Sequence, residues 1–282
     1  MLTRNKPVAI VTGSSRGIGF WTALKLSETY IVYLFARSLE SKDEKQGLIE
    51  AKEIIESDGG EVEIRVVDIK ERGLAEKTID EIYEERGRLD ILVNNAGDYI
   101  PTSSDSSFED KERIRKLDRD AHERIIEYVF GKFKKEKNNH LKILTVLSQA
   151  ALRVFPKGLA YGSAKMGLLS TILHLREEQS REGISNIDLY NVYPATTGTE
   201  SVMKLVRAGD IEDPMPVKAV VDTVMDLLED RTETKDAYVG YVPGEGIKRV
   251  YMDFDPNRYN LLELMKHSEK VIDKDFDPKS LI

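Results

Sequence analysis

A tyrosine and a lysine four residues apart, Tyr161 and Lys165, are the side chains of this sequence best suited to proton transfer. Residues i and i+4 share one face of a helix, so the ammonium group should lie near the phenol. A free tyrosine has a pKa of about 10, and a nearby cation lowers it by favouring the phenolate. A carbonyl that accepts hydride gains charge on its oxygen and needs a proton there. Tyr161 is therefore predicted to be the general acid and base of a carbonyl–alcohol interconversion.

Ser148 lies 13 residues before Tyr161 and directly follows the apolar run at residues 143–147. Ligands of open α/β sheets bind at the carboxyl ends of parallel strands, so the Ser148 hydroxyl is expected to hydrogen-bond the substrate oxygen. An isolated Tyr-x-x-x-Lys pair is more often an ordinary surface pair on a helix. The serine and the glycine-rich segment nearer the N-terminus argue against that reading here.

A glycine-rich segment, Thr-Gly-Ser-Ser-Arg-Gly-Ile-Gly at residues 12–19, follows the first apolar run and opens a helical pattern. Gly13 permits a tight turn, Gly17 lets the backbone approach a pyrophosphate, and Gly19 lets the helix pack close to the sheet. The free N–H groups at the start of a helix bind anions. The segment therefore predicts a dinucleotide-binding loop. Its expected cofactor-binding residues are Gly13, Ser15, Arg16, Gly17, Ile18 and Gly19.

The residue after the second apolar run indicates which dinucleotide is bound. An NAD site usually has a carboxylate about 20 residues past the glycines, which accepts a hydrogen bond from the ribose 2′-hydroxyl. This chain has Arg37 there, 18 residues after Gly19, and Arg16 adds a second positive charge. A guanidinium suits a 2′-phosphate. Although either arginine alone is commonly a solvated surface residue, the two together predict NADP (NADPH) rather than NAD.

Short apolar runs alternate with longer amphipathic segments along the chain. The predicted strands are at residues 8–11, 31–35, 62–67, 89–93, 143–147 and 187–192, with 237–242 as a candidate seventh. The predicted helices are at residues 18–29, 44–57, 72–86, 108–137 and 160–181, and Ser106 and Glu109 have capping-box spacing before the fourth. This alternation favours an α/β fold, a Rossmann-like doubly wound parallel sheet of about seven strands with helices on both faces.

Composition narrows the class of protein further. The 282 residues carry a net charge of −8 and no cysteine, which disfavours nucleic acid as a partner and excludes disulfides and thiolate sites. No run approaches the ~18 apolar residues of a membrane span, and no signal-peptide core is found, so a cytoplasmic protein is expected. We expect a single domain over residues 1–282, with a C-terminal extension of unassigned role at 245–282. The four histidines show no metal-ligand spacing: His122, His140, His174 and His267.

Four ordered motifs resemble those of the short-chain dehydrogenase/reductase family. They are the Thr-Gly-x-x-x-Gly-x-Gly segment, Asn-Asn-Ala-Gly at residues 94–97, Ser148, and Tyr161-x-x-x-Lys165; Pro194 then follows the sixth predicted strand. The resemblance covers about residues 7–200. It implies an NADP-dependent oxidoreductase of the carbonyl reductase or alcohol dehydrogenase type, acting on a small-molecule carbonyl or alcohol as a homodimer or homotetramer.

The resemblance also implies further cofactor contacts. Asp68 and Ile69 would lie against the adenine, although a strand-end cap is an equally good reading of Asp68. Tyr161 and Lys165 would lie at the nicotinamide end, where this lysine holds the ribose. The remaining implied contacts, along the middle of the cofactor and near its carboxamide and a phosphate, are Asn94, Ala96, Gly97, Pro194, Thr197 and Thr199.

Two departures from the family pattern qualify this interpretation. Where the family has an asparagine that helps to hold a relay water, this chain has Asp118, with Asp120 as an alternative register. A carboxylate there would partly cancel the effect of Lys165 on Tyr161, so that the enzyme would be slower or would have its pH optimum shifted to the alkaline side; the alternative is a solvent-facing aspartate. Ala195 replaces a glycine. These departures support an alternative function, an NADP-binding regulatory protein with weak or no turnover. A third reading, an unrelated mononucleotide-binding protein, leaves the serine, tyrosine and lysine unexplained.

Substrate contacts are expected from residues 152–155, from Tyr193 and from residues 201–216, a mixed apolar set that suits a small or medium substrate with an apolar body. The apolar face of the helix after Tyr161 is wider than one stripe, which favours burial against the sheet and a second subunit. Trp21 is expected in the core.

Overall fold

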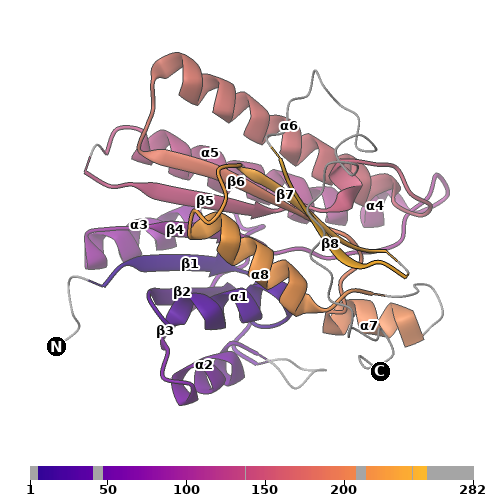
Figure 1. Ribbon diagram of the computed structural model, residues 1–282, viewed down its shortest axis with the longest axis horizontal. Coiled ribbons are helices and arrows are strands. Elements are labelled where there is room, and N and C mark those ends of the chain that lie inside the picture. The colour runs from indigo at the N-terminus through magenta and orange to yellow at the C-terminus, as the bar shows by residue number, and fades with distance from the viewer. Residues whose placement is uncertain (1–5, 41–46, 137, 208–213, 243, 253–282) are drawn as a thin grey trace.

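The protein forms one eight-stranded sheet in the order β3-β2-β1-β4-β5-β6-β7-β8 (Figure 1). This computed structural model describes residues 6–40, 47–136, 138–207, 214–242 and 244–252. Neighbouring strands pair in parallel from β3 to β7, and β8 pairs antiparallel with β7. The strands are β1 (Val8–Thr12), β2 (Ile31–Ala36), β3 (Glu61–Val66), β4 (Ile91–Asn94), β5 (Leu141–Val146), β6 (Ile187–Pro194), β7 (Asp236–Val242) and β8 (Gly246–Met252).

Helices cover both faces of this sheet, because each strand alternates its side chains between two apolar cores. In β1, Val8 and Ile10 face the core that holds α3, α5 and α6, while Ala9 and Val11 face the core that holds α1, α2 and α8 (Figure 1). The α-helices are α1 (Gly17–Ser27), α2 (Leu48–Ser57), α3 (Leu74–Arg86), α4 (Phe108–Arg115), α5 (His122–Phe133), α6 (Leu159–Glu182), α7 (Glu200–Arg207) and α8 (Val217–Leu228). The doubly wound Rossmann-like fold expected from the sequence is confirmed.

Each predicted strand exists, with ends that differ by at most two residues. The sheet has one strand more than expected: β8 occupies the start of the proposed C-terminal extension, and residues 253–282 lie outside the described residues. The helices α7 and α8 were not predicted. The expected long helix at 108–137 is three consecutive segments, because the π-helical η1 (Lys116–Ala121) separates α4 from α5.

Two local expectations are wrong. The N-cap of α4 is Ser107, whose hydroxyl accepts a hydrogen bond from Asp110 N, whereas Ser106 accepts one from Ser103 N outside the helix. Trp21 is 47% exposed, because the buried face of α1 is set by Phe20, Ala23 and Leu26 and turns residue 21 outward.

Within the described ranges, none of the helices combines the length and the apolar character that a membrane crossing requires.

Candidate active site

A cavity of about 990 Å³ lies along the carboxyl ends of the parallel strands. It is lined by the segments that follow β1 through β6, as expected for an open α/β sheet. Most predicted site residues line it: Gly13, Ser15, Arg16, Gly17, Ile18, Arg37, Asp68, Ile69, Ala96, Gly97, Asp118, Ser148, Tyr161, Lys165, Pro194, Thr197 and Thr199. Gly19 and Asn94 do not line it. One cavity therefore joins the glycine-rich loop to the serine, tyrosine and lysine.

The glycine-rich loop has no room for side chains at two of its glycines. A Cβ atom at Gly13, where φ is +65°, would lie 2.6 Å from the Cα atom of Ala96. A Cβ atom at Gly19 would lie 2.3 Å from the Gly13 carbonyl oxygen, so Gly19 packs the helix against the loop and stays behind the cavity wall. Because α1 begins at Gly17 with neither a side-chain cap nor an acidic residue in its first turn, its N–H groups suit an anion.

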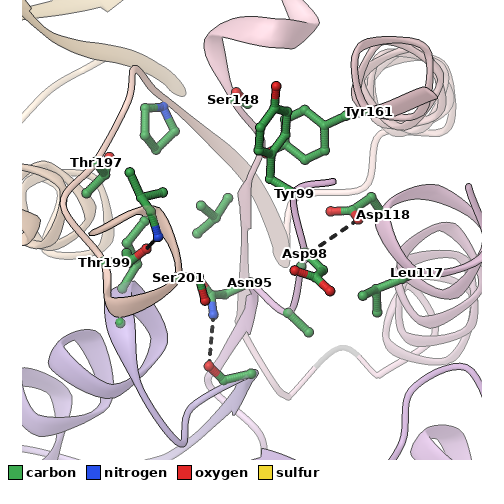
Figure 2. Close-up of a pocket in the computed structure, with 18 of the residues that line it drawn as sticks. Asn95, Asp98, Tyr99, Leu117, Asp118, Ser148, Tyr161, Thr197, Thr199 and Ser201 are labelled. Carbon is green, nitrogen blue, oxygen red and sulfur yellow. Dashed lines mark hydrogen bonds between the residues drawn. The ribbon is translucent and has the colours of Figure 1, made fainter. Parts of the chain in front are cut away.

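Asn95 is a residue that the sequence analysis missed. Its side-chain amide donates hydrogen bonds to the carbonyl oxygens of Thr12 (2.9 Å) and Gly13 (3.2 Å), and its side chain lies beside the cavity (Figure 2). In return, the Thr12 hydroxyl accepts hydrogen bonds from the N–H groups of Asn95 (2.9 Å) and Ala96 (3.0 Å). The 94–97 turn and the glycine-rich loop therefore form one rigid unit, although 82 residues separate them.

Asn94 has its side chain turned away from the cavity and is fully buried. Its Oδ1 atom lies 2.6 Å from Nδ1 of His122, and the Nε2 atom of the same imidazole contacts the Ala96 carbonyl oxygen. Burial, and next the charge of Lys165, lower the pKa of His122 to about 3, so the imidazole is neutral. Both of these oxygens are acceptors and a neutral imidazole carries one N–H, so His122 can donate to only one of them at a time. His122 therefore holds the 94–97 turn from behind, a structural role as expected for the histidines.

The end of the cavity beyond β2 carries positive charge. Arg37 is exposed there and forms no ion pair with any described residue, while Arg16 lines the wall nearby as the N-cap of α1. Asp68 fits both of its readings: its Oδ1 atom accepts a hydrogen bond from Lys70 N (3.0 Å), as a cap does, and it also lines the cavity. Cationic side chains of this kind suit a phosphate.

Ser148 and Tyr161 come together at the opposite end (Figure 2). Ser148 caps the short 3₁₀ helix η2 (Gln149–Ala151), where its hydroxyl accepts a hydrogen bond from Ala150 N (3.1 Å). Tyr161 lies in the first turn of α6, and its phenol is close enough to the Ser148 hydroxyl for that group to lower its pKa. The edge-to-face contact with Tyr99, at 5.3 Å between ring centroids, holds the Tyr161 ring in place.

The expected lowering of the Tyr161 pKa by Lys165 is wrong for this arrangement. Burial raises the pKa of the Tyr161 phenol well above 10, the Asp118 and Asp98 carboxylates raise it further, and the nearby Ser148 hydroxyl lowers it. The Lys165 ammonium lies 5.6 Å from the centre of the Tyr161 ring but only 3.3 Å from Asp118 Oδ1. The cation is therefore neutralised by the nearer carboxylate.

The segment between β6 and α7 lies against the glycine-rich loop. Ala195 N donates a hydrogen bond to Val239 O (2.8 Å), and the Thr197 hydroxyl donates one to Ala195 O (2.9 Å). The Thr199 hydroxyl accepts one from Val202 N (3.4 Å), and the Thr199 methyl group would be 3.3 Å from a Cβ atom at Gly17. Both threonines thus have local structural partners while lining the cavity.

Some of the residues expected to contact the substrate line the cavity, and others do not. Phe155 and Tyr99 pack together beside Tyr161, with 6.3 Å between the centroids of the first two rings. Leu152 and Tyr193 are buried in the core instead, and the Tyr193 hydroxyl donates to Asp236 (2.7 Å), so the expectation of substrate contacts from these two residues is wrong. From the expected 201–216 segment, the cavity is lined by Ser201, Val202, Lys204 and Leu205; residues 208–213 lie outside the described residues.

The family model for short chain dehydrogenases matches residues 7–210, which include every part of this site. The chain belongs to the short-chain dehydrogenase/reductase family. It is an oxidoreductase with the nucleotide-binding fold of that family.

Relatives of known sequence and structure agree with this assignment. An uncharacterized oxidoreductase of Listeria monocytogenes is 31% identical over 202 residues, which are 71% of this chain and 77% of the relative. A 3α-hydroxysteroid dehydrogenase of Mediterraneibacter gnavus is 31% identical over 214 residues, 74% of this chain and 80% of the relative. A metagenomic short-chain oxidoreductase solved in complex with NADP has the same fold, with a TM-score of 0.66 at 22% identity over 83% of this chain and 96% of the other.

Asp118 is the departure from the family pattern that the structure places in the site. It lies in the π-helical turn η1, a kind of irregularity often found at functional sites. Its side chain is 0% exposed, and that of Lys165 is 2% exposed. The two groups form an ion pair, but Asp118 Oδ1 has no hydrogen-bond partner among the described residues. Asp118 Oδ2 accepts a hydrogen bond from Asp98 N (3.4 Å). Asp120, the alternative register, binds Arg119 outside the cavity. The reading of Asp118 as a solvent-facing residue is therefore wrong.

The Asp118 carboxyl titrates close to the neutral range. Burial raises its pKa to about 6, while the Lys165 ammonium acts in the opposite direction. A carboxyl with a raised pKa stabilises the fold when protonated, and this contribution is lost as the pH rises from about 4 through 6. At pH 7 and above the carboxylate is charged and opposes ionisation of Tyr161.

With Tyr161 as general base, Asp118→Asn is expected to move the pH dependence of alcohol oxidation toward acid, because such oxidation would need the Tyr161 phenolate and the variant removes a nearby negative charge. The rising limb of kcat against pH should shift by about one unit, measured between pH 6 and 10.5. Asp120→Asn, on the same helix and outside the cavity, is the control and should leave the limb in place. An unshifted limb in Asp118→Asn would show that this carboxylate does not act on Tyr161.

Proposed function

We propose that this protein is an NADP-dependent short-chain oxidoreductase that interconverts a carbonyl and an alcohol, with Tyr161 as general acid and base. The observation that carries the proposal is that Ser148 and Tyr161 lie together on the wall of a cavity that also contains the glycine-rich loop (Figure 2). Two hydroxyl groups so placed can donate to one carbonyl oxygen, the atom on which charge develops. A protonated phenol at neutral pH, as the raised pKa of Tyr161 implies, is the form that carbonyl reduction needs.

The cavity residues fit a dinucleotide cofactor. The N–H groups at the start of α1 suit its pyrophosphate, and Arg37 and Arg16 suit a 2′-phosphate. Asp118 Oδ1, a buried oxygen with no hydrogen-bond partner among the described residues, lies beside Lys165, the residue proposed to hold the nicotinamide ribose. The other proposed contacts along the cavity are Gly13, Ser15, Gly17, Ile18, Asp68, Ile69, Ala96, Gly97, Tyr161, Pro194, Thr197 and Thr199. Neither Gly19 nor the Asn94 side chain is included, because both lie behind the cavity wall.

In the proposed mechanism the bound cofactor supplies the hydride, and the chain supplies the proton and the geometry. Ser148 orients the carbonyl oxygen, and Tyr161 donates its phenolic proton to that oxygen as the alcohol forms. Lys165 and Asp118 set the charge around the resulting phenolate. Tyr99 and Phe155 supply an apolar wall that excludes water from the reacting atoms.

The test is a panel of aldehydes and ketones monitored by NADPH absorbance. Oxidation of NADPH that depends on the carbonyl supports the proposal. Tight NADPH binding without turnover across the panel would favour the second candidate, an NADP-binding regulatory protein. One observation favours that candidate: Lys165 is paired with Asp118, and the Tyr161 phenol is not acidic in the described arrangement.

The choice of NADP rests on Arg37 and is tested by its removal. Arg37→Ala should raise the KM for NADPH by roughly 10- to 100-fold, the worth of a charge-assisted hydrogen bond, and leave the KM for NADH nearly unchanged. Arg181→Ala, which removes an exposed arginine at the far end of α6, is the matched control. Equal changes for both cofactors in Arg37→Ala would contradict the assignment of this residue to the 2′-phosphate.

We also propose that the protein resides in the cytoplasm and assembles as a homodimer or homotetramer. The apolar side chains of Leu159 and Met166 are exposed near the start of α6, which supports burial of this helix against a second subunit. Light scattering of the purified protein tests the oligomeric state.

A further inference from the structure

The helix that carries Tyr161 and Lys165 is capped by a residue from another part of the chain. Its own N-cap is Gly158, which has no side chain to accept a hydrogen bond. The first free N–H groups of α6 bind Thr102 instead: Leu159 N donates to Thr102 O (3.2 Å), and Ala160 N donates to Thr102 Oγ1 (2.9 Å). Thr102 belongs to the segment between β4 and α4, 58 residues earlier in the chain. Thr102 therefore caps α6 from a distant part of the same chain, whereas an N-cap residue normally lies directly before its helix.

The backbone around this contact is bent to reach it. Thr102 N donates a hydrogen bond to Lys157 O (2.7 Å), and Thr102 and Gly158 form an isolated parallel bridge. Lys157 has φ of +56°, a left-handed conformation that residues other than glycine seldom adopt. A Cβ atom at Gly158 would lie 2.7 Å from the Phe155 ring. Thr102 is 1% exposed, so water cannot replace these hydrogen bonds without local opening.

The contact lies next to the reacting groups without being one of them. Ala160 directly precedes Tyr161, so the cap acts on the turn from which the phenol projects. Tyr99 belongs to the same segment as Thr102, and its ring meets the Tyr161 ring edge-on. Thr102 itself does not line the cavity. The cap therefore joins the substrate wall at Tyr99 to the position of the Tyr161 hydroxyl.

We propose that Thr102 is a positioning residue of the reaction, which holds the start of α6 so that the Tyr161 hydroxyl meets Ser148. The inference rests on the proposed carbonyl reduction and goes beyond it, because it assigns control of the phenol to a side chain that touches neither substrate nor cofactor. A small misplacement of a reacting group is enough to slow a reaction about 100-fold. Binding of the cofactor at the glycine-rich loop should not depend on Thr102.

The test compares Thr102→Val, which keeps the shape of the side chain but loses the acceptor, with Thr102→Ser, which keeps the acceptor. Thr102→Val is expected to lower kcat by roughly 10- to 100-fold with little change in the dissociation constant of NADPH. Hydrogen exchange of the Ala160 amide, whose acceptor is the Thr102 hydroxyl, should become about tenfold faster, as expected for a lost cap. Thr102→Ser should restore both values.

Thr223→Val is the matched control, because Thr223 is also fully buried and its hydroxyl bonds to Ala219 O (2.7 Å) in α8, away from the cavity. It should change neither kcat nor exchange in α6. Unchanged exchange and kcat in Thr102→Val, or an equal loss of kcat in Thr102→Ser, would overturn the proposal. If Thr102→Val does not fold, Thr102→Ala is compared with Thr102→Ser in the same way. The exchange readout needs no turnover: if the wild-type protein were inactive, which would refute the proposed function, unchanged exchange in Thr102→Val would still overturn the role of Thr102 and faster exchange would support it.

Discussion

Tyr161→Phe is expected to lower kcat for carbonyl reduction by about 10³-fold, within the range that general acid catalysis contributes. The substitution removes the proton donor, while the phenyl ring keeps its edge-to-face contact with Tyr99. Tyr161 is one of many proposed cofactor contacts, and those along the rest of the cavity are untouched. The NADPH dissociation constant, measured by fluorescence, should therefore stay close to that of the wild type.

Tyr99→Phe is the control for this experiment, since it removes a phenolic hydroxyl from the same cavity and retains the ring contact with Tyr161. It should retain most of the activity. A Tyr161→Phe enzyme that still reduces its substrate at a comparable rate would show that the proton comes from another group. The assignment of Tyr161 as general acid would then be wrong.

Lys165→Met is expected to lower both activity and stability, because it leaves the Asp118 carboxyl buried without its cation. Removing one partner of a buried ion pair costs about 3 kcal/mol of unfolding free energy or more. The catalytic loss should be about 10²-fold, since a positioned charge near the reacting atoms is removed. Urea unfolding at pH 8 and steady-state kinetics measure the two effects.

The double variant Lys165→Met with Asp118→Asn separates these two effects. Neutralising both partners should recover most of the stability, because no unpaired charge remains in the core. It should not recover the activity, because the ammonium is still missing. A single Lys165→Met variant as stable as the wild type would contradict the buried pair seen in the structure. Recovery of turnover in the double variant would show that Lys165 acts only by neutralising Asp118.

Strand and loop positions could be predicted because they depend on local patterns. The run Val-Ala-Ile-Val at residues 8–11 is buried on both faces, and the glycines that follow it have steric reasons visible in their spacing. β8 was missed because an edge strand packed on one face has a weaker pattern. Trp21 was wrongly predicted to be buried because a large apolar side chain favours the core, whereas the neighbouring residues determine which face of α1 packs on the sheet.

Part of the candidate site could likewise be predicted from the sequence, and part could not. Ser148, Tyr161 and Lys165 could be chosen from residue types and spacing, because helical periodicity and strand ends place them on one side of the sheet. The environment of each of these side chains could not be predicted from the sequence, since it depends on contacts between distant segments. Asn94 is buried against His122, and Asn95 rather than Asn94 supports the glycine-rich loop.

By itself, the sequence determined the order of the first seven strands and of the helices up to α6, the glycine-rich loop and the three side chains proposed for the reaction, because each follows from short-range geometry. Only the tertiary structure decided that Asp118 rather than Asp120 faces Lys165, that the pKa of Tyr161 is raised by burial and by the nearby carboxylates, and that Thr102 caps α6. The physical reason is that pKa values and caps depend on distances and desolvation across segments tens of residues apart. No local pattern encodes those quantities.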